Sequence, residues 1–326
     1  MTQNITFFLA AFLLSLPFWL GFNVSSETLS EAFFWKEMTE SPELLQAQVI
    51  RQKLEEQVLR ERPILKQNVL SPEIQAQSAL SIFIRKDGGT KILFEQGGSR
   101  RLPIASITKL MTAQVVAKHY DPATRITISR SAVLEEQDAG YLRIGDVFSV
   151  QDLLYPLLME SSNDAAAAFA EMMGKEAFVD LMNLESGELG LKDTHFVNPA
   201  GLDPSDPTGP INYSTAHDLA ALAGHLVFEY PDIFQILSIK EQALFTSAGT
   251  FHHTMKNTNE LLSFDGWPTP VVGGKTGWTP LAQGTLVLVL QGPKEQGYIV
   301  NVVLGAQDRF SAMKTLVNWV YDSFTW

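Results

Sequence analysis

The chain has 326 residues and a mass of 36.1 kDa, and its 45% hydrophobic and 18% charged residues exclude a disordered or low-complexity protein. Its 24 Lys and Arg against 36 Asp and Glu give a net charge of −12. No nucleic acid partner is therefore expected, because an acidic surface repels phosphates. Cysteine is absent, which excludes disulfides, thiolate metal sites and a cysteine nucleophile.

The first predicted element is an apolar segment, residues 5–24, that contains no charged residue. About twenty apolar residues in a helix can cross a hydrocarbon core of about 30 Å. The residues before the segment include no Lys or Arg, and no small-x-small cleavage site follows it. An uncleaved membrane anchor at residues 1–24 is therefore favoured over a cleaved signal peptide.

Residues 25–70 are predicted to form a helical stalk or linker. Leu and Val recur there at roughly helical spacing among charged and amide residues, and Pro63 ends the pattern. A short self-associating helix is the alternative. The compact domain is expected to comprise residues 71–326.

Within this domain, strands are predicted near both ends and helices between them. The sequence Asp87-Gly88-Gly89 predicts a tight turn between two strands. The predicted strands are residues 79–85, 91–95, 270–276, 284–290 and 298–304, and the predicted helices include residues 153–159, 164–173 and 309–321. This order predicts one sheet built from both ends of the domain, with a helical subdomain inserted.

One candidate for nucleophilic catalysis is the S-x-x-K pattern of Ser106 and Lys109. Pro103 and the apolar run after it predict a helix N-terminus, so the two side chains should share one helix face. A serine hydroxyl needs a base to take its proton, and a lysine whose pKa is lowered by burial or nearby cations can be that base. The pattern alone is common by chance.

Two further segments are candidates for walls of the same cleft. Ser161 and Asn163 lie between two predicted helices, where Asn163 could alternatively be only a helix N-cap. Residues 273–277, Gly-Gly-Lys-Thr-Gly, end an apolar strand and lack the spacing of a phosphate-binding loop. On an edge strand, Lys275 and Gly277 would share a face, and the glycine would let a ligand approach the backbone.

The six histidines show no metal-binding spacing, and neither a metal site nor a cofactor is expected. His252 and His253 are adjacent, so on a regular strand their side chains would point to opposite faces and could not bind a metal together. Both are interpreted as structural histidines.

The motifs S-x-x-K, S-x-N and K-T-G, in this order, are the signature of penicillin-binding proteins and class A β-lactamases. The sequence resembles the serine-type D-Ala-D-Ala carboxypeptidases, which are low-molecular-mass penicillin-binding proteins of peptidase family S11. The resemblance covers residues 79–321 and rests on the blocks PIASITKLMTA, DLLYPLLMESSNDAA, FVNPAGLD, YSTAHDLA, NTNELL, GGKTGWT and VVLGAQDRF. It implies an α+β fold of the β-lactamase/transpeptidase type, with an antiparallel sheet of about five strands flanked by helices.

The resemblance also implies roles for the catalytic residues. Ser106 would be the nucleophile that forms an acyl-enzyme, and Lys109 its general base. Ser161 would relay a proton to the leaving amine, and Asn163 would position Lys109 and the substrate amide. The backbone N–H groups of Ser106 and Trp278 would form the oxyanion hole.

The remaining matched residues would bind the substrate. Lys275 would supply positive potential, Thr276 would hydrogen-bond the substrate, and Gly277 would let it approach the strand. Arg309 would bind the terminal carboxylate, to which a planar guanidinium is suited. Thr258 stands where some members have Arg, which leaves carboxylate binding to Arg309 and Lys275.

The implied reaction is the removal of the terminal D-Ala from peptidoglycan stem peptides, with β-lactam antibiotics as covalent inhibitors. A DD-endopeptidase acting on peptidoglycan cross-links is an alternative. A β-lactamase would need a deacylating carboxylate over Ser106, and although Glu185 and Glu188 lie in the right stretch, no E-x-x-L-N pattern is present. A peptidoglycan-binding protein without activity is disfavoured because every catalytic position keeps a competent residue.

The resemblance implies a location in the cell envelope, at the extracytoplasmic face of the cytoplasmic membrane, or export if the N-terminal segment is cleaved. The family's common C-terminal β-domain is not recognised after the last predicted helix, so the N-terminal segment is expected to take over anchoring. Ser162 stands where the family usually has Gly and is expected to be tolerated.

Overall fold

The computed structural model describes residues 46, 48–51, 53–54, 62–133, 141–206 and 208–326. The chain divides into two units, Met1–Ile64 with Thr325–Trp326, and Leu65–Phe324. The predicted anchor at residues 1–24 lies outside the described residues, and the described residues between 46 and 54 are helical. In the part of the chain that is described, no helix is both long and apolar enough to cross a membrane.

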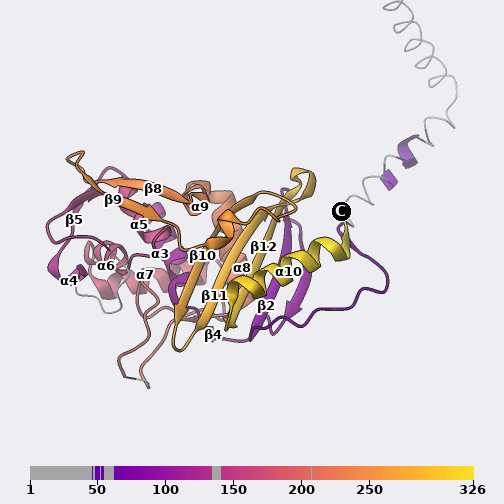
Figure 1. The fold of residues 1–326 in the computed structure, drawn as a ribbon, viewed down its shortest axis with the longest axis horizontal. Coiled ribbons are helices and arrows are strands. Elements are labelled where there is room, and N and C mark those ends of the chain that lie inside the picture. The colour runs from indigo at the N-terminus through magenta and orange to yellow at the C-terminus, as the bar shows by residue number, and fades with distance from the viewer. Residues whose placement is uncertain (1–45, 47, 52, 55–61, 134–140, 207) are drawn as a thin grey trace, which may run out of the picture. The chain divides into compact units, whose positions relative to one another are not determined.

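The larger unit is built on an antiparallel five-stranded sheet with the strand order β10-β11-β12-β2-β3 (Figure 1). Its strands are β2 (Ser78–Arg85), β3 (Thr90–Gln96), β10 (Val271–Thr279), β11 (Gln283–Gln291) and β12 (Gly297–Ala306). Strand β2 pairs with β12, so the indigo strands of Figure 1 lie beside the orange ones. The sheet predicted from both ends of the domain is therefore confirmed, and the fold is α+β.

Strand β11 contains an almost uninterrupted apolar run and lies inside the sheet, between β10 and β12. Residues 284–290 are all buried, because helices cover both faces of the sheet. Helix α8 (Ala216–Glu229) packs against β2, β11 and β12, and α10 (Arg309–Ser323) crosses the opposite face, in front of the sheet in Figure 1. A strand that is covered on both faces is stabilised by apolar residues at every position, whereas a strand with one exposed face has them at alternate positions.

The helical subdomain lies between β3 and β10 in the sequence and beside the β10 edge of the sheet (Figure 1). Its elements are the 3-10 helix η1 (Ala105–Thr108), α3 (Lys109–His119), α4 (Arg130–Val133), α5 (Val150–Leu158), α6 (Asn163–Glu171), α7 (Lys175–Glu188) and α9 (Pro231–Ser238). The alanine-rich α6 is buried from Asn163 to Ala170. Its small side chains let α4, α5 and α7 pack closely around it.

Short elements complete the part of the chain that is described from residue 62 onward. Three pairs of strands are β4 (Leu102–Pro103) with β7 (Tyr213–Ser214), β5 (Arg125–Thr127) with β6 (Val147–Ser149), and β8 (Glu241–Phe245) with β9 (Phe251–Lys256). The remaining elements are β1 (Ile64–Leu65), β13 (Phe324–Thr325) and the 3-10 helices η2 (Glu260–Ser263) and η3 (Pro293–Glu295). The predicted turn between β2 and β3 is present, with Gly88 at a φ of +84°.

The prediction that His252 and His253 point to opposite faces is wrong. Strand β9 has a bulge here, because Leu244 pairs with His253 and Phe245 with Phe251, which leaves His252 without a partner on β8. The bulge brings the two rings together, with their Nδ1 atoms 2.5 Å apart. Among the described residues, no group of three or more His, Asp or Glu side chains could hold a metal ion.

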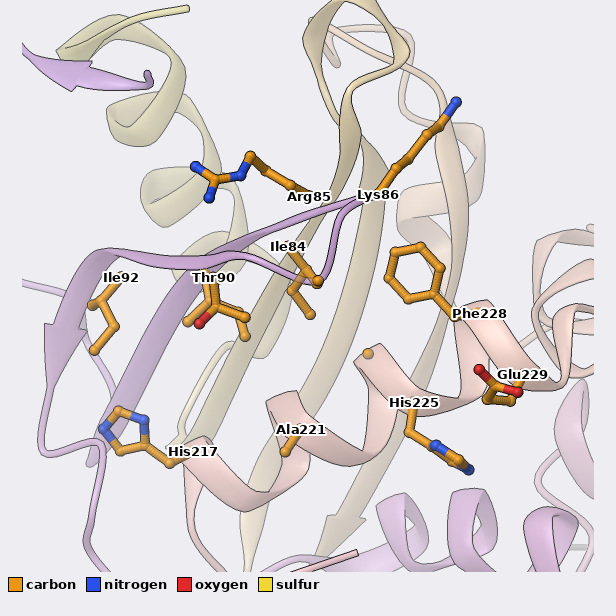
Figure 2. A pocket seen from close by; sticks show the side chains of 13 residues that line it. Ile84, Arg85, Lys86, Thr90, Ile92, His217, Ala221, His225, Phe228 and Glu229 are labelled. Carbon is orange, nitrogen blue, oxygen red and sulfur yellow. The ribbon is translucent and has the colours of Figure 1, made fainter. Parts of the chain in front are cut away.

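A cavity of about 630 Å³ lies between β2, β3 and α8 (Figure 2). Ile84 from the sheet and Ala221 and Phe228 from α8 line it, together with the charged Lys86 and Glu229. None of the predicted site residues lines this cavity. The candidate site lies elsewhere, where η1 meets β10.

Candidate active site

Ser106 and Lys109 lie on consecutive helices. Ser106 belongs to η1, Lys109 begins α3, and the Lys109 Nζ atom is 2.9 Å from the Ser106 Oγ atom. The prediction that these two side chains share a face is confirmed. Ala105, just before the serine, has a φ of 48°, in the left-handed region that non-glycine residues seldom adopt and that is frequent at functional sites.

The Lys109 amine is fully buried and contacts three oxygen atoms. These are Ser106 Oγ at 2.9 Å, Asn163 Oδ1 at 2.8 Å and the Ala200 carbonyl at 2.7 Å. Burial, and after it the positive charge of Lys275, holds the pKa of Lys109 well below its usual value of 10.5. The contacting atoms of Asn163 and Ala200 are oxygens, which can only accept hydrogen bonds. A neutral amine can donate its two N–H groups to them, and its lone pair can then accept the Ser106 proton.

The Ala200 carbonyl is a partner of Lys109 that the sequence analysis missed. The Oδ1 atom of Asn198 accepts hydrogen bonds from the backbone N–H groups of Ala200, Gly201 and Leu202, at 3.1, 2.7 and 3.1 Å, and so fixes the turn. Gly201 has a φ of +83°, and a Cβ atom there would lie 1.9 Å from the Ala105 carbonyl oxygen. The only signal in the sequence was Asn-Pro-Ala-Gly, which predicts a turn but not its distant contact.

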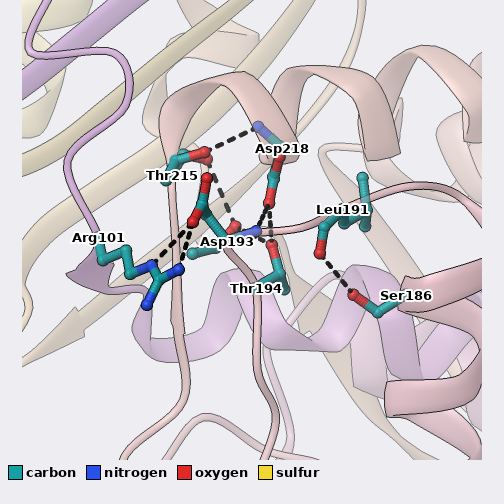
Figure 3. A network of polar contacts seen from close by, with 8 residues as sticks. Arg101, Ser186, Leu191, Asp193, Thr194, Thr215 and Asp218 are labelled. Carbon is teal, nitrogen blue, oxygen red and sulfur yellow. Dashed lines mark hydrogen bonds and ion pairs between the residues drawn. The ribbon is translucent and has the colours of Figure 1, made fainter.

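A polar network fixes both ends of the segment that carries this turn (Figure 3). The Oδ2 atom of Asp218, in α8, accepts hydrogen bonds from the Asp193 backbone N–H and the Thr194 hydroxyl, each at 2.8 Å. The Thr215 side chain caps α8 by accepting from the Asp218 N–H at 3.1 Å. Arg101 Nε donates to the Asp193 carboxylate at 2.9 Å. The segment from Asp193 to Thr215 is therefore tied to α8 and to the residue before β4.

The turn between α5 and α6 contributes Ser161 and Asn163. Ser161 has a φ of 63°, and its Oγ atom is buried without a hydrogen-bond partner among the described residues. The N-cap of α6 is Ser162, whose Oγ accepts from the Ala165 N–H at 3.1 Å. The Asn163 side chain is therefore not the cap and reaches Lys109 instead, and a serine at position 162 is accommodated as expected.

Strand β10 is an edge strand, as predicted, and its Lys-Thr-Gly end lies against η1. A Cβ atom at Gly277 would lie 2.9 Å from the Ser106 backbone nitrogen and 2.4 Å from Thr285 Oγ1. Only glycine permits this approach, which brings the strand backbone beside Ser106. The next residue, Trp278, has a side chain that is 57% exposed.

Lys275 and Thr276 lie on the same strand. Lys275 is buried, and its Nζ atom donates to the Thr276 carbonyl at 3.0 Å. Burial, and then the positive charge of Arg309, lowers the pKa of Lys275 to about 7. The Thr276 Oγ1 atom lies 2.6 Å from Thr258 Oγ1. The Nε atom of Arg309 is buried and has no hydrogen-bond partner in the described part of the chain.

The two carboxylates considered for a β-lactamase belong to α7 and contact α3. Buried Glu185 lies 2.9 Å from Lys118 Nζ and 2.7 Å from His119 Nε2. Glu188 lies 3.0 Å from the same Lys118. Both carboxylates therefore pair with side chains at the end of α3, whereas Ser106 precedes the first residue of that helix.

Solved structures with this fold define the class of protein. A D-alanyl-D-alanine carboxypeptidase from Mycobacterium tuberculosis superposes with a TM-score of 0.68 at 26% identity, covering 79% of this chain and 95% of that one. The Streptomyces K15 DD-transpeptidase gives a TM-score of 0.67 at 27% identity, covering 78% of this chain and 100% of that one. The fold is that of penicillin-binding proteins and DD-peptidases.

The sequence comparison narrows the class to one family. The profile of peptidase family S11, described as D-alanyl-D-alanine carboxypeptidase, matches residues 65–308, so the chain belongs to this family. It is 29% identical over 263 residues to the D-alanyl-D-alanine carboxypeptidase DacF of Bacillus subtilis, covering 77% of this chain and 64% of that protein. It is 31% identical over 257 residues to the D-alanyl-D-alanine endopeptidase of Escherichia coli, covering 76% and 78%.

Proposed function

We propose that the protein is a serine D-alanyl-D-alanine carboxypeptidase, which removes the terminal D-Ala of peptidoglycan stem peptides through an acyl-enzyme on Ser106. The observation that carries the proposal is the buried amine of Lys109, 2.9 Å from the Ser106 hydroxyl. Membership of family S11 supports the same activity.

In the acylation step, Ser106 Oγ attacks the carbonyl carbon of the penultimate D-Ala and Lys109 takes its proton. The lowered pKa of Lys109 keeps a fraction of the amine neutral and able to act as the base. Ser161 then passes a proton to the amine of the departing D-Ala, a role that its unpartnered buried hydroxyl supports. Asn163 holds the lysine in place through its Oδ1 atom.

The strand β10 contributes the groups that bind the substrate. The backbone N–H groups of Ser106 and Trp278 form the oxyanion hole, and the close approach at Gly277 supports this pairing. Thr276 donates to the substrate, and Lys275 attracts its carboxylate whenever it is protonated. Arg309 adds a second positive charge close enough to lower the pKa of Lys275.

We also propose that β-lactam antibiotics acylate Ser106 and leave slowly. The departing D-Ala of a peptide frees space for the water that hydrolyses the ester, whereas an opened β-lactam ring stays tethered there. Glu185 and Glu188 pair with Lys118 and supply no carboxylate for a trapped water. These contacts support a peptidase over a β-lactamase.

The domain is proposed to act outside the cytoplasmic membrane, held there by residues 5–24. The uncharged apolar length of that segment and the absence of a cleavage site support this location. Fractionation of cells that express the full chain tests it. Mature protein that begins near residue 24 and is found in the soluble extracytoplasmic fraction would contradict the anchor.

The activity is tested with a diacyl peptide that ends in D-Ala-D-Ala. Incubation with the purified protein should release free D-alanine, whereas the Ser106→Ala variant should release none. A folded wild-type protein that releases no D-alanine from any such peptide would contradict the proposed function.

A further inference from the structure

Strand β9 and the residues after it contact the turn that carries Ser161 at two adjacent positions. The Thr258 N–H, just after the strand, donates to the Met159 carbonyl at 3.0 Å. On the strand itself, His253 Nε2 lies 2.9 Å from Glu160 Oε2. Glu160 directly precedes Ser161, whose φ of 63° is a conformation that a non-glycine residue keeps only when its surroundings fix it. The two contacts therefore hold the residues that lead into Ser161.

The contact with Glu160 ends a chain of four titratable side chains. His253 Nδ1 lies 2.5 Å from His252 Nδ1, and His252 Nε2 lies 2.8 Å from Asp146 Oδ2. The bulge in β9 makes this chain possible, because on a regular strand the two rings would point to opposite faces. The His252 and Glu160 side chains are only 3% and 9% exposed, so water cannot readily replace a hydrogen bond that the chain loses.

The geometry of the chain sets the number of protons that it holds. Each of the three contacts needs one proton between its two atoms. An ionised carboxylate can only accept, so both Nε2 atoms donate and the two Nδ1 atoms share one further proton. The two imidazoles then carry +1 and the two carboxylates −2, which gives the four side chains a net charge of −1. Moving a proton along the chain onto a carboxylate leaves this total unchanged.

A change in the number of protons breaks one of the contacts. A fourth proton on an imidazole would place a proton on both Nδ1 atoms, and the two rings would then repel each other. With only two protons, one contact would join two lone pairs. Because the four groups interact directly, they titrate together rather than one by one. The chain is therefore complete only in a middle range of pH.

The surroundings of the chain oppose the entry of a fourth proton. Besides Glu160, the titratable side chains that line the same cavity as the two histidines are Tyr141, Arg143 and Lys256. Arg143 and Lys256 are cations, which disfavour a further positive charge nearby. The rings of Tyr141 and Phe148 pack against the two imidazoles, with centroid distances of 5.4 and 5.8 Å. The chain is therefore expected to lose its order only below neutral pH.

We propose that His253 is a positioning residue: together with His252 it holds the Glu160 carboxylate, and through Glu160 it holds Ser161 in the turn from which the hydroxyl reaches the leaving amine. The inference rests on the proposed function, in which Ser161 relays that proton. His253 acts through Glu160 and touches no reacting atom. The turn is held fully only while the four side chains share three protons, so proton transfer by Ser161 becomes less efficient when a fourth proton enters the chain.

The test measures kcat and KM for D-alanine release from a D-Ala-D-Ala peptide by the full-length protein. His253→Phe keeps a planar ring but has no donor for Glu160, and it should lower kcat about 10–100-fold with KM within about twofold of the wild type. His253→Gln offers an amide N–H in place of Nε2 and should keep kcat within a few-fold at pH 7. His217→Phe is the matched control, because His217 Nε2 also lies 2.9 Å from a carboxylate, that of Glu95, and neither residue belongs to the candidate site. It should keep both kinetic constants.

The dependence on pH separates this role from a merely structural contact. Between pH 7 and pH 5, the ratio of kcat for the wild type to kcat for His253→Gln should fall roughly threefold or more, because the histidine pair takes up a proton and the amide does not titrate. Protonation of Lys109 lowers kcat in both proteins and cancels in the ratio. A ratio that stays constant over this range would overturn the positioning role.

The remaining outcomes separate the inference from the proposed function. A folded His253→Phe variant with the kcat of the wild type would overturn the positioning role, and so would an equal loss of kcat in His217→Phe. If circular dichroism shows that His253→Phe is unfolded, the pH dependence of His253→Gln decides alone. Release of no D-alanine by the wild type would overturn the proposed function, and this inference with it.

Discussion

The carbonyl oxygen of Ala200 accepts a 2.7 Å hydrogen bond from the Lys109 amine, 91 residues away in the sequence. With Asn163 Oδ1 as the second acceptor, it uses the two N–H groups of a neutral amine and directs the lone pair to Ser106. The turn around Asn198 is therefore part of the catalytic machinery that we propose.

The first prediction concerns the contact between this turn and η1. Gly201→Ala should slow acylation by penicillin about 100-fold, because the new Cβ would displace Ala105 and with it Ser106. Gly190→Ala is the matched control, since Gly190 also has a left-handed φ, of +70°, but nothing within 4 Å of its Cβ position. The control should lose only about 1 kcal/mol of stability. Equal acylation rates in the two variants would contradict the role of the turn.

Lys109→Met should reduce kcat for D-alanine release by about 10²–10⁴, the usual contribution of a general base. Methionine keeps most of the buried volume but cannot accept the Ser106 proton. Lys192→Met, at an exposed position, removes a positive charge without touching the site and should keep full activity. Penicillin labelling of the Lys109 variant at a rate within a few-fold of the wild type would show that another group is the base.

Lys275 should make stability depend on pH. The pKa of Lys275 is about 7 in the folded protein and returns towards 10.5 on unfolding. At a pH between these two values, the Lys275 amine is therefore protonated in the unfolded state and largely neutral in the folded state. The free energy of unfolding should rise with pH from 7 to 10, by up to about 1.4 kcal/mol per unit from this group. In Lys275→Met that part of the slope should disappear. Urea unfolding of both proteins at pH 7, 8 and 9 measures it, and parallel pH dependences would contradict the buried, shifted lysine.

Release of penicillin should be much slower than turnover of the peptide. The tethered leaving group blocks water, and the two glutamates of α7 that were considered as deacylating carboxylates are paired with Lys118. Intact-protein mass spectrometry over time should show a penicilloyl adduct on the protein. This adduct should persist for much longer than one turnover of the peptide by enzyme that has not been exposed to penicillin. An adduct that clears within seconds while the antibiotic is consumed would instead identify a β-lactamase.

The parts of this structure that local patterns encode could be predicted from the sequence. Two such patterns are the apolar run of β11 and the three-residue spacing of Ser106 and Lys109. Each depends only on residues that are close together in the chain. The Ala200 contact could not be predicted, because a backbone carbonyl has no side-chain signature. The orientation of His252 also could not, because it depends on a register shift against β8.

The central claim is that Ser106 is the nucleophile activated by Lys109. The most direct measurement is mass spectrometry of the peptides obtained by digestion after brief exposure to penicillin, for the wild type and for Ser106→Ala. We predict a single penicilloyl adduct on Ser106 in the wild type and no adduct in the variant. An adduct at another residue, or labelling that survives in the variant, would contradict the account.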